Sequence, residues 1–169
     1  INHSHLPEWR KHIDYKRSSS AKKKFGGGVI LDCSHEIDLA TWFLGKIDIL
    51  FVDKSKKSNL KIDTEDHCKV YGAQKKINIT IDLNYFSIIR KRKIHILGNN
   101  FKIDADLAKS KITIIRKNKK KITKNFKKNE MNKTYFLELK GLLNKNKQYL
   151  TDLDSAMKTQ KLIQNIQNF

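Results

Sequence analysis

The sequence is poor in the residues that build cross-linked or membrane-spanning proteins. Its 169 residues include two cysteines, one proline and seven glycines. Cys33 and Cys68 have neither CxxC spacing nor a second pair, so we expect two buried free thiols instead of a disulfide framework or a zinc knuckle. No apolar run approaches the roughly 20 residues of a membrane span, and no secretory signal pattern is present. These absences predict a soluble, cytoplasmic protein.

Acidic residues are also scarce. Asp and Glu number 17 against 36 Lys and Arg, which gives a formal net charge of +19. Basic chains of this size often bind nucleic acid, because phosphates that are neutralised release counterions. Lysine, however, is spread through every segment, and the abundance of Lys, Ile and Asn is what an AT-rich coding sequence produces. Arginine, which suits bidentate phosphate contacts, is rare. Nucleic acid is therefore the weaker partner hypothesis.

Motifs for phosphate and metal binding are missing as well. The chain contains neither GxGxxG nor GxxxxGK[ST], the glycine-rich loops that cradle phosphates, so no residue is expected to bind a cofactor. His3 and His5 lie near one end of the chain, where we expect them to be solvated, and no set of three dependable metal ligands is evident. At this length the usual expectation is a single domain, here residues 1–169.

Chemistry is concentrated between Gly26 and Gly45. Three glycines open the segment, and glycine is used where the backbone needs positive φ or must let another group approach. Five groups able to titrate or to bind metal follow within seven residues: Asp32, Cys33, His35, Glu36 and Asp38. The pattern from Ser34 to Leu44 is helical, with Ser34 or Asp32 as the expected N-cap and Gly45 as the C-terminal glycine. We predict a tight loop, open to a ligand, that leads into a buried helix.

The rest of the chain divides by its hydrophobic period. Residues 1–25 show little periodicity and are predicted to form an irregular loop. Residues 46–128 alternate with a period of two, and the period returns to helical in residues 129–169. The strands are expected at residues 47–52, 65–72, 75–86, 90–97, 100–107 and 111–116, with an edge strand within 118–128. Short turns at 72–74, 98–100 and 108–110 indicate antiparallel neighbours.

Two helices are predicted at the end of this pattern. The first is lined by Tyr135, Phe136, Leu139, Leu142 and Leu143. The second is lined by Leu153, Met157, Ile163 and Ile166, with Thr151 or Asp152 as its cap. Both helices are expected to pack their apolar faces into the core. The fold class is therefore α+β: a mostly antiparallel open sheet of about six strands with helices packed on one face.

His35 is the strongest candidate for chemistry. A histidine on a buried helix is more often a core residue than a catalyst, but Asp32 and Asp38 both lie within a turn of it, and a carboxylate can orient an imidazole. Such a pair suits proton transfer to or from a hydroxyl. A metal site is the alternative, although a third dependable ligand is not in view.

The segment from Gly26 to Asp38, GGGVILDCSHEID, followed by Trp42 and Gly45, resembles the signature of the Gfo/Idh/MocA oxidoreductases. It is similar to the C-terminal, substrate-side domain of members that act on sugars and nucleotide-sugar-derived compounds. The residues LPEWR at 6–10 and DY at 14–15 are similar to the loop that precedes the glycines in one branch. The resemblance covers essentially the whole chain.

The resemblance implies specific roles. His35 matches the histidine that acts as acid or base on the substrate hydroxyl while hydride passes to or from a nicotinamide. Asp32 matches the acidic residue upstream of it, which in many members precedes the histidine by one residue more. Asp38 matches the aspartate that follows. Substrate-binding residues are then expected to be Trp9, Arg10, Tyr15 and Asp38, with residues 1–25 as a substrate-side loop.

Family members also carry an N-terminal dinucleotide-binding domain, which is absent from these 169 residues. The resemblance implies NAD or NADP as cofactor, bound mainly by that domain in the same chain or in another one. Whether the chain catalyses a reaction by itself stays open. The leading hypothesis is a substrate-binding and oligomerisation domain for a sugar-like substrate, which forms homo-oligomers through its sheet. The alternative is a non-catalytic basic module that binds nucleic acid or an acidic surface.

Overall fold

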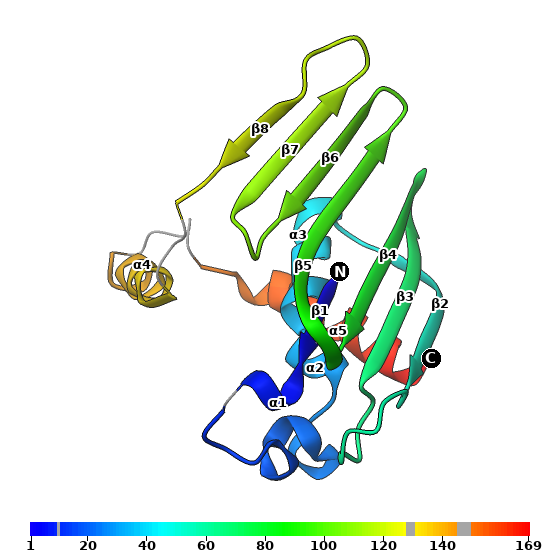
Figure 1. Cartoon of the computed structure of the whole chain (residues 1–169), viewed down its shortest axis with the longest axis vertical. Helices are drawn as coiled ribbons and strands as arrows, with labels where there is room; N and C mark the ends of the chain where they lie inside the picture. Colours follow the sequence, from blue (N-terminus) through cyan, green and yellow to red (C-terminus); the bar gives the residue numbers. More distant parts are fainter. Residues whose placement is uncertain (10, 128–130, 145–149) are drawn as a thin grey trace. The chain divides into compact units, whose positions relative to one another are not determined.

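The computed structural model describes residues 1–9, 11–127, 131–144 and 150–169. The chain divides into two compact units. Unit 1 comprises residues 1–92 and 159–169, and unit 2 comprises residues 93–158. The strands are hydrogen-bonded in the order β2-β3-β4-β1-β5-β6-β7-β8, and β5 contributes residues to both units (Figure 1). The predicted α+β class with a mostly antiparallel sheet is confirmed, and the described residues form eight strands in place of about six.

The centre of unit 1 is an antiparallel meander of β2 (Asp48–Ser55), β3 (His67–Gln74) and β4 (Ile77–Asn84). Its first tight turn falls at residues 75–76, where Lys75 takes a φ of 52°, and not at the predicted 72–74. Gly72 lies inside β3. A side chain is unfavourable at this position because a Cβ would come within 2.9 Å of the Ile47 side chain. The glycine therefore serves packing, and the lysine makes the turn.

Residues 1–25 are more ordered than predicted. They contain β1 (Asn2–His5), α1 (Leu6–Trp9) and three short 3₁₀ turns, η1 (Tyr15–Arg17), η2 (Ser19–Ala21) and η3 (Lys23–Phe25). β1 inserts between β4 and β5, parallel to the first and antiparallel to the second. Its sequence, NHSH, has no apolar alternation, so the strand depends on its two neighbours for hydrogen bonds.

The motif segment forms two consecutive helices, α2 (Val29–Asp32) and α3 (Ser34–Leu44). The bounds predicted for α3 are confirmed, and so is Gly45, whose N–H donates to the Thr41 carbonyl at 2.7 Å. The predicted N-caps are wrong. Because α2 runs directly into α3, Cys33 takes the cap position, without a side-chain hydrogen bond.

The core of unit 1 lies between the meander and two helices. Val52, Val70 and Ile81 stand opposite one another on one sheet face and are buried. Ile37 of α3 and Ile163 of α5 (Leu153–Asn168) belong to the same buried cluster, so both helices cover this face. Cys33 and Cys68 are buried free thiols, as predicted, and burial raises the pKa of each to about 12.

The prediction that the motif helix is buried is only half right. Glu36 and Ile37 are the buried residues of α3, whereas Trp42 is 75% exposed and Phe43 is 55% exposed. The apolar pattern of α3 extends around most of the helix, but only its first half packs against the core. A sequence pattern cannot tell which apolar surface finds a neighbour in these residues.

Unit 2 is built from the second half of β5 (Phe86–Gly98), followed by β6 (Phe101–Asp106), β7 (Lys111–Arg116) and β8 (Ile122–Asn125). These strands form an antiparallel meander (Figure 1). Its register puts apolar residues opposite one another on one face, which we call the isoleucine face: Ile94, Ile96, Phe101, Ile103, Ala105, Ile112, Ile114 and Ile122. The other face carries Lys93, His95, Lys102, Asp104, Asp106 and Lys111.

The helices near the end of the chain are confirmed as elements, but much of their predicted packing is wrong. α4 (Met131–Leu143) exposes all five residues predicted to pack in the core. Leu153 and Met157 of α5 are also exposed, while Ile163 and Ile166 are buried. Asp152 caps α5, since its Oδ1 accepts the N–H of Ser155 at 2.7 Å. Among the described helices, none is long and apolar enough to cross a membrane.

Candidate functional site

The three glycines are required by backbone conformation at Gly26, by close packing at Gly27 and by both at Gly28. Gly26 adopts a left-handed φ of 73°. A Cβ on Gly27 would lie 2.3 Å from the Ser19 carbonyl oxygen, and one on Gly28, where φ is 119°, would lie 2.2 Å from Glu65 Oε1. L-residues rarely take the φ values of Gly26 and Gly28, and a side chain at Gly27 would clash with the backbone, so these positions need glycine. The expectation of a loop open to a ligand is therefore wrong at Gly27 and Gly28, because the protein itself fills the space.

Glu65 anchors this loop, and its role was not predicted. Its Oε1 accepts the N–H of Ile30 at 3.2 Å, and its backbone carbonyl accepts the N–H of Val29 at 3.2 Å. Burial raises the pKa of the Glu65 carboxyl, although the hydrogen bond from Ile30 opposes that shift. The carboxylate and the backbone carbonyl of Glu65 thus each accept one N–H group at the start of α2. The sequence signal was slight: an acidic pair, Glu65 and Asp66, just before a strand.

Asp32 is held by a buried tyrosine. The hydroxyl of Tyr85, which follows β4, donates to Asp32 Oδ2. Tyr85 is fully buried, and burial, followed by the hydrogen bond to Asp32, raises its pKa, so the phenol remains a donor. Trp9 packs edge-on against Tyr85 with ring centroids 5.2 Å apart. Tyr85 therefore links the acidic residue of the motif to the N-terminal loop.

Two of the predicted substrate-binding residues line one small hollow. Trp9 and Tyr15 face it together with Leu6, Ile13, Ser18 and Ser20. The hydroxyl of Tyr15 accepts the N–H of Lys61 at 3.2 Å, and Trp9 remains 41% exposed. Trp9 and Tyr15 thus line the same hollow, and Tyr85 connects Trp9 to Asp32. Arg10, the remaining predicted residue of this loop, lies outside the described residues.

His35 lies at the start of α3 with its side chain 51% exposed. Its Nε2 is 3.0 Å from Glu36 Oε1 and 3.3 Å from Asn2 Nδ2. Glu36 is 8% exposed, and the same Oε1 accepts Arg92 Nε–H at 2.6 Å and Asn2 Nδ2–H at 3.0 Å. Burial opposes ionisation of Glu36, but the hydrogen bond from His35 and the charge of Arg92 outweigh it, so its pKa is lowered.

Asn2 and Arg92 were missed because strand pairing brings them to His35. In the register of β1, Asn2 stands opposite Leu83 of β4 and Arg92 of β5. Neither residue belongs to a local motif, and they are 90 positions apart in the sequence. Glu36 stood within the motif, but nothing in its neighbours suggested a buried carboxylate.

Asp38 faces another helix. Its Oδ1 accepts the hydroxyl of Thr159 on α5 at 2.7 Å, and its backbone carbonyl accepts the hydroxyl of Thr41 at 2.8 Å. The first bond fastens α3 to α5, and the second lies within α3. The structure therefore gives Asp38 a packing contact, and its substrate-binding role remains a prediction.

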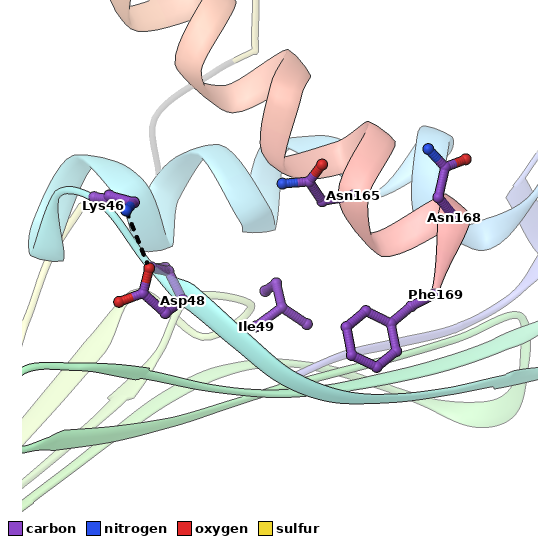
Figure 2. A pocket seen from close by; sticks show the side chains of 7 residues that line it. Lys46, Asp48, Ile49, Asn165, Asn168 and Phe169 are labelled. Carbon is purple, nitrogen blue, oxygen red and sulfur yellow. Dashed lines mark ion pairs between the residues drawn. The ribbon is translucent and has the colours of Figure 1, made fainter.

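A larger hollow of unit 1 lies elsewhere. It has a volume of about 490 Å³ and is lined by the start of β2 and the end of α5 (Figure 2). Lys46 and Asp48 form an ion pair of 3.3 Å at its side, and Phe169 points toward Ile49 across it (Figure 2). It contains none of the predicted site residues. Nor is any group of three or more metal-binding side chains found in the described part of the chain.

No family model matches the chain, and no curated protein sequence matches it. Solved structures do. UDP-N-acetylglucosamine 3-dehydrogenase GnnA from Acidithiobacillus ferrooxidans matches with a TM-score of 0.73 at 10% identity, over 99% of this chain and 50% of that chain. The WlbA dehydrogenase from Bordetella pertussis, in complex with NADH and UDP-GlcNAcA, matches with a TM-score of 0.65 at 14% identity, over 99% of this chain and 52% of that chain.

An inositol dehydrogenase homolog from Azotobacter vinelandii, complexed with NAD+, matches with a TM-score of 0.54 at 9% identity, over 83% of this chain and 46% of that chain. At these identities the likeness establishes the fold. The chain spans about half the length of the proteins it matches. It therefore has the fold that part of each of these proteins adopts, and the predicted resemblance to Gfo/Idh/MocA-type dehydrogenases is confirmed at the level of the fold.

Proposed function

We propose that the chain is the substrate-binding and oligomerisation domain of an NAD(P)-dependent oxidoreductase that acts on a hydroxyl or carbonyl of a sugar or nucleotide-sugar-derived compound. The observation that carries the proposal is a half-exposed histidine, fixed by a partly buried ion pair, in a fold shared with dehydrogenases. Two of those dehydrogenases are named for nucleotide-sugar substrates or were solved with one. The two buried thiols suit the cytoplasmic location that the sequence predicts.

The loop of Gly26, Gly27 and Gly28 does not fit the pyrophosphate of a nicotinamide dinucleotide. A dinucleotide pyrophosphate needs free N–H groups at a glycine loop and a helix N-terminus. Here Ser19 and Ser20 fill the space beside Gly27, and the Glu65 carboxylate accepts the N–H of Ile30. An anion beside that carboxylate would be repelled. In this proposal NAD or NADP is held mainly by a dinucleotide-binding domain, in the same chain or in a partner chain.

In this proposal each site residue has one task. His35 gives a proton to the substrate oxygen or takes one from it, because its ring is exposed on one side and hydrogen-bonded on the other. Asp32, held by Tyr85, accepts a hydrogen bond from the substrate. Trp9 and Tyr15 offer aromatic faces to the sugar ring, and Arg10 and Asp38 complete the predicted set of binding residues.

The two tryptophans of the chain allow a direct test of substrate binding. Trp42→Phe leaves Trp9 as the single fluorescent tryptophan, and Trp9→Phe leaves Trp42, which lies on α3 away from the hollow. UDP-N-acetylglucosamine is the probe, with UMP and pyrophosphate as controls for simple phosphate binding. We expect the sugar nucleotide to change Trp9 emission in a saturable way and to leave Trp42 emission unchanged.

Two outcomes would overturn the binding proposal. One is the absence of any Trp9 response to the sugar nucleotide. The other is an equal response to pyrophosphate that disappears as salt rises, because neutralisation of phosphates by lysines weakens steeply with ionic strength. That second outcome would favour the basic-module alternative.

The oligomerisation part of the proposal concerns the sheet face of unit 1 that α3 and α5 leave uncovered. On this face Phe51 and Tyr71 stand opposite each other with ring centroids 6.0 Å apart, and Phe51 is 55% exposed. Exposed aromatic residues are enriched in protein interfaces. Phe51→Glu should lower the oligomer mass measured by light scattering, whereas Phe25→Glu, at a similarly exposed phenylalanine in η3, should not. A monomeric wild type would contradict the proposal.

A further inference from the structure

The hydrogen-bond partner of His35 Nε2 determines whether this nitrogen carries a hydrogen. It thereby determines which ring nitrogen can exchange a proton with a substrate. Two groups lie within reach of Nε2: Glu36 Oε1 at 3.0 Å and Asn2 Nδ2 at 3.3 Å. They make opposite demands. A carboxylate oxygen only accepts, so it requires hydrogen on Nε2, whereas the Asn2 amide nitrogen only donates and would require a bare Nε2.

The surroundings of Glu36 decide between these demands. Its Oε1 already accepts hydrogen bonds from Arg92 Nε at 2.6 Å and from Asn2 Nδ2 at 3.0 Å, and the side chain is 8% exposed. Charge-assisted bonds of this kind hold a carboxylate ionised and immobile. The amide of Asn2 therefore has its acceptor in Glu36. Its longer contact with Nε2 is not needed to satisfy it.

The competing arrangement is unfavourable. If Nε2 were bare, its lone pair would face the anionic oxygen of Glu36 at 3.0 Å, and two acceptors at that distance repel. In the imidazolium form both nitrogens carry hydrogen, and Nε2–H still donates to Glu36. The hydrogen on Nε2 is thus kept in both protonation states.

We infer that Glu36, fixed by Arg92, is the positioning residue that holds neutral His35 as the Nε2–H tautomer, so that protons enter and leave the ring at Nδ1. When His35 acts as a base, the substrate O–H bond breaks and an Nδ1–H bond forms. When His35 acts as an acid, the Nδ1–H bond breaks, and an O–H bond forms as the substrate oxygen receives the proton. The catalytic meaning rests on the proposed function, whereas the tautomer itself does not.

The arrangement also orients the ring. With Nε2 held at the buried carboxylate of Glu36, Nδ1 is the ring nitrogen that remains for a substrate, and the side chain as a whole is 51% exposed. A general base needs its reactive atom within hydrogen-bond reach of the proton that it removes. A ring that rotated freely would present either nitrogen and would lose that alignment.

The test reads the tautomer by NMR. The ¹⁵N-labelled 169-residue chain is studied by long-range ¹H–¹⁵N correlation at a pH where the ring is neutral, and His35→Gln assigns its signals among the six histidines. We expect a pyrrole-type shift for Nε2 and a pyridine-type shift for Nδ1. The reverse pattern in the wild type would overturn the inference without any variant.

Two variants separate the candidate partners. Asn2→Ala removes the amide and leaves the carboxylate, so the tautomer should stay the same. Glu36→Ala removes the carboxylate and leaves Asn2 free to donate to Nε2, so the hydrogen should move to Nδ1. A reversal in Asn2→Ala, or an unchanged pattern in folded Glu36→Ala, would contradict the assignment. Because no substrate is needed, this result is independent of the sugar-nucleotide titration.

Discussion

The two units of this chain are built from similar antiparallel strands but differ in what covers them. In unit 1 the meander β2–β4 is covered on one face by α3 and α5, and the core includes fully buried residues such as Ile37, Leu83 and Tyr85. In unit 2, Ala105 is the one buried hydrophobic residue among those described. Its isoleucine face includes Ile96, Phe101 and Ile122, each more than 40% exposed. An alternating pattern thus produces a sheet in both units but a core in only one.

This difference in packing explains why the candidate site residues belong to unit 1. A site needs side chains held in place by packing and by surrounding hydrogen bonds. His35, Asp32, Glu36 and Tyr85 all belong to unit 1, where the core supports them. Unit 2 offers a large apolar face instead. Faces of that kind on a soluble protein usually mark a surface that another element or chain covers.

The largest expected effect comes from one substitution made in both units. Ile37→Ala removes a fully buried side chain from unit 1, and we expect it to lower the free energy of unfolding by about 2–5 kcal/mol. Ile96→Ala, on the isoleucine face at 42% exposure, should cost less than about 1 kcal/mol. Urea unfolding followed by circular dichroism measures both. Equal losses would mean that the isoleucine face is buried in solution.

The next prediction compares the same glycine-to-alanine substitution in the two units. Gly28→Ala combines a φ of 119° with a clash against the Glu65 carboxylate, so we expect a loss of roughly 1–3 kcal/mol or more. A Cβ on Gly98 of unit 2 would come as close to Phe101, at 2.3 Å. That ring is 43% exposed and can turn away, and we expect a loss below about 1 kcal/mol. A tolerated Gly28→Ala would remove the argument that Glu65 anchors the loop.

Acid should weaken unit 1 through Glu36. Its pKa is lowered in the folded chain, so its contribution to stability is present above its ordinary value of 4.5 and is lost as the pH falls through the folded value. Glu36→Gln should therefore be less stable than the wild type at about pH 6, and the gap should close toward about pH 3. Urea midpoints measured across this range follow the gap.

Glu65 provides the control of opposite sign. Burial raises its pKa, so its ionisation costs stability as the pH rises above the ordinary value of 4.5. Glu65→Gln keeps an oxygen for the Ile30 N–H, and it should gain stability relative to the wild type as the pH rises. The same slope in both variants would contradict the assignment of the two carboxylates.

The smallest expected effect is that of Trp42→Ala. A buried tryptophan would cost about 3–5 kcal/mol on truncation, which is what a fully buried motif helix would require. Because Trp42 is 75% exposed, we expect a change within about 1 kcal/mol by urea unfolding. A loss of several kcal/mol would show that another surface covers α3 in solution.

The sequence was sufficient to predict those features that depend on residues close together in the chain. The α3 bounds, the Gly45 cap and the Asp152 cap depend on residues within a few positions of one another, and all were predicted. β1 was missed because its polar sequence has no period, and its hydrogen bonds come from strands some 80 residues away. Burial of α4 was overpredicted because amphipathic spacing shows an apolar face without showing its partner.

The same distinction holds for the site. His35 and Asp32 were identified from a continuous motif, and Trp9 and Tyr15 from a short loop, and the structure places Asp32 beside this loop through Tyr85. Arg92 and Asn2 could not be predicted, because only the register of three strands brings them to Glu36. Tyr85 was visible as the end of an apolar alternation, but its hydroxyl partner was not.

The main proposal is that unit 1 carries the substrate side of an oxidoreductase site. It is tested most directly by titrating the ¹⁵N-labelled chain with UDP-N-acetylglucosamine at physiological salt and mapping the amide and side-chain shifts. We expect saturable chemical-shift changes at Trp9, Tyr15 and His35, and no change in the amide shifts of β6–β8. Changes confined to the lysines of unit 2, and lost as salt rises, would contradict it.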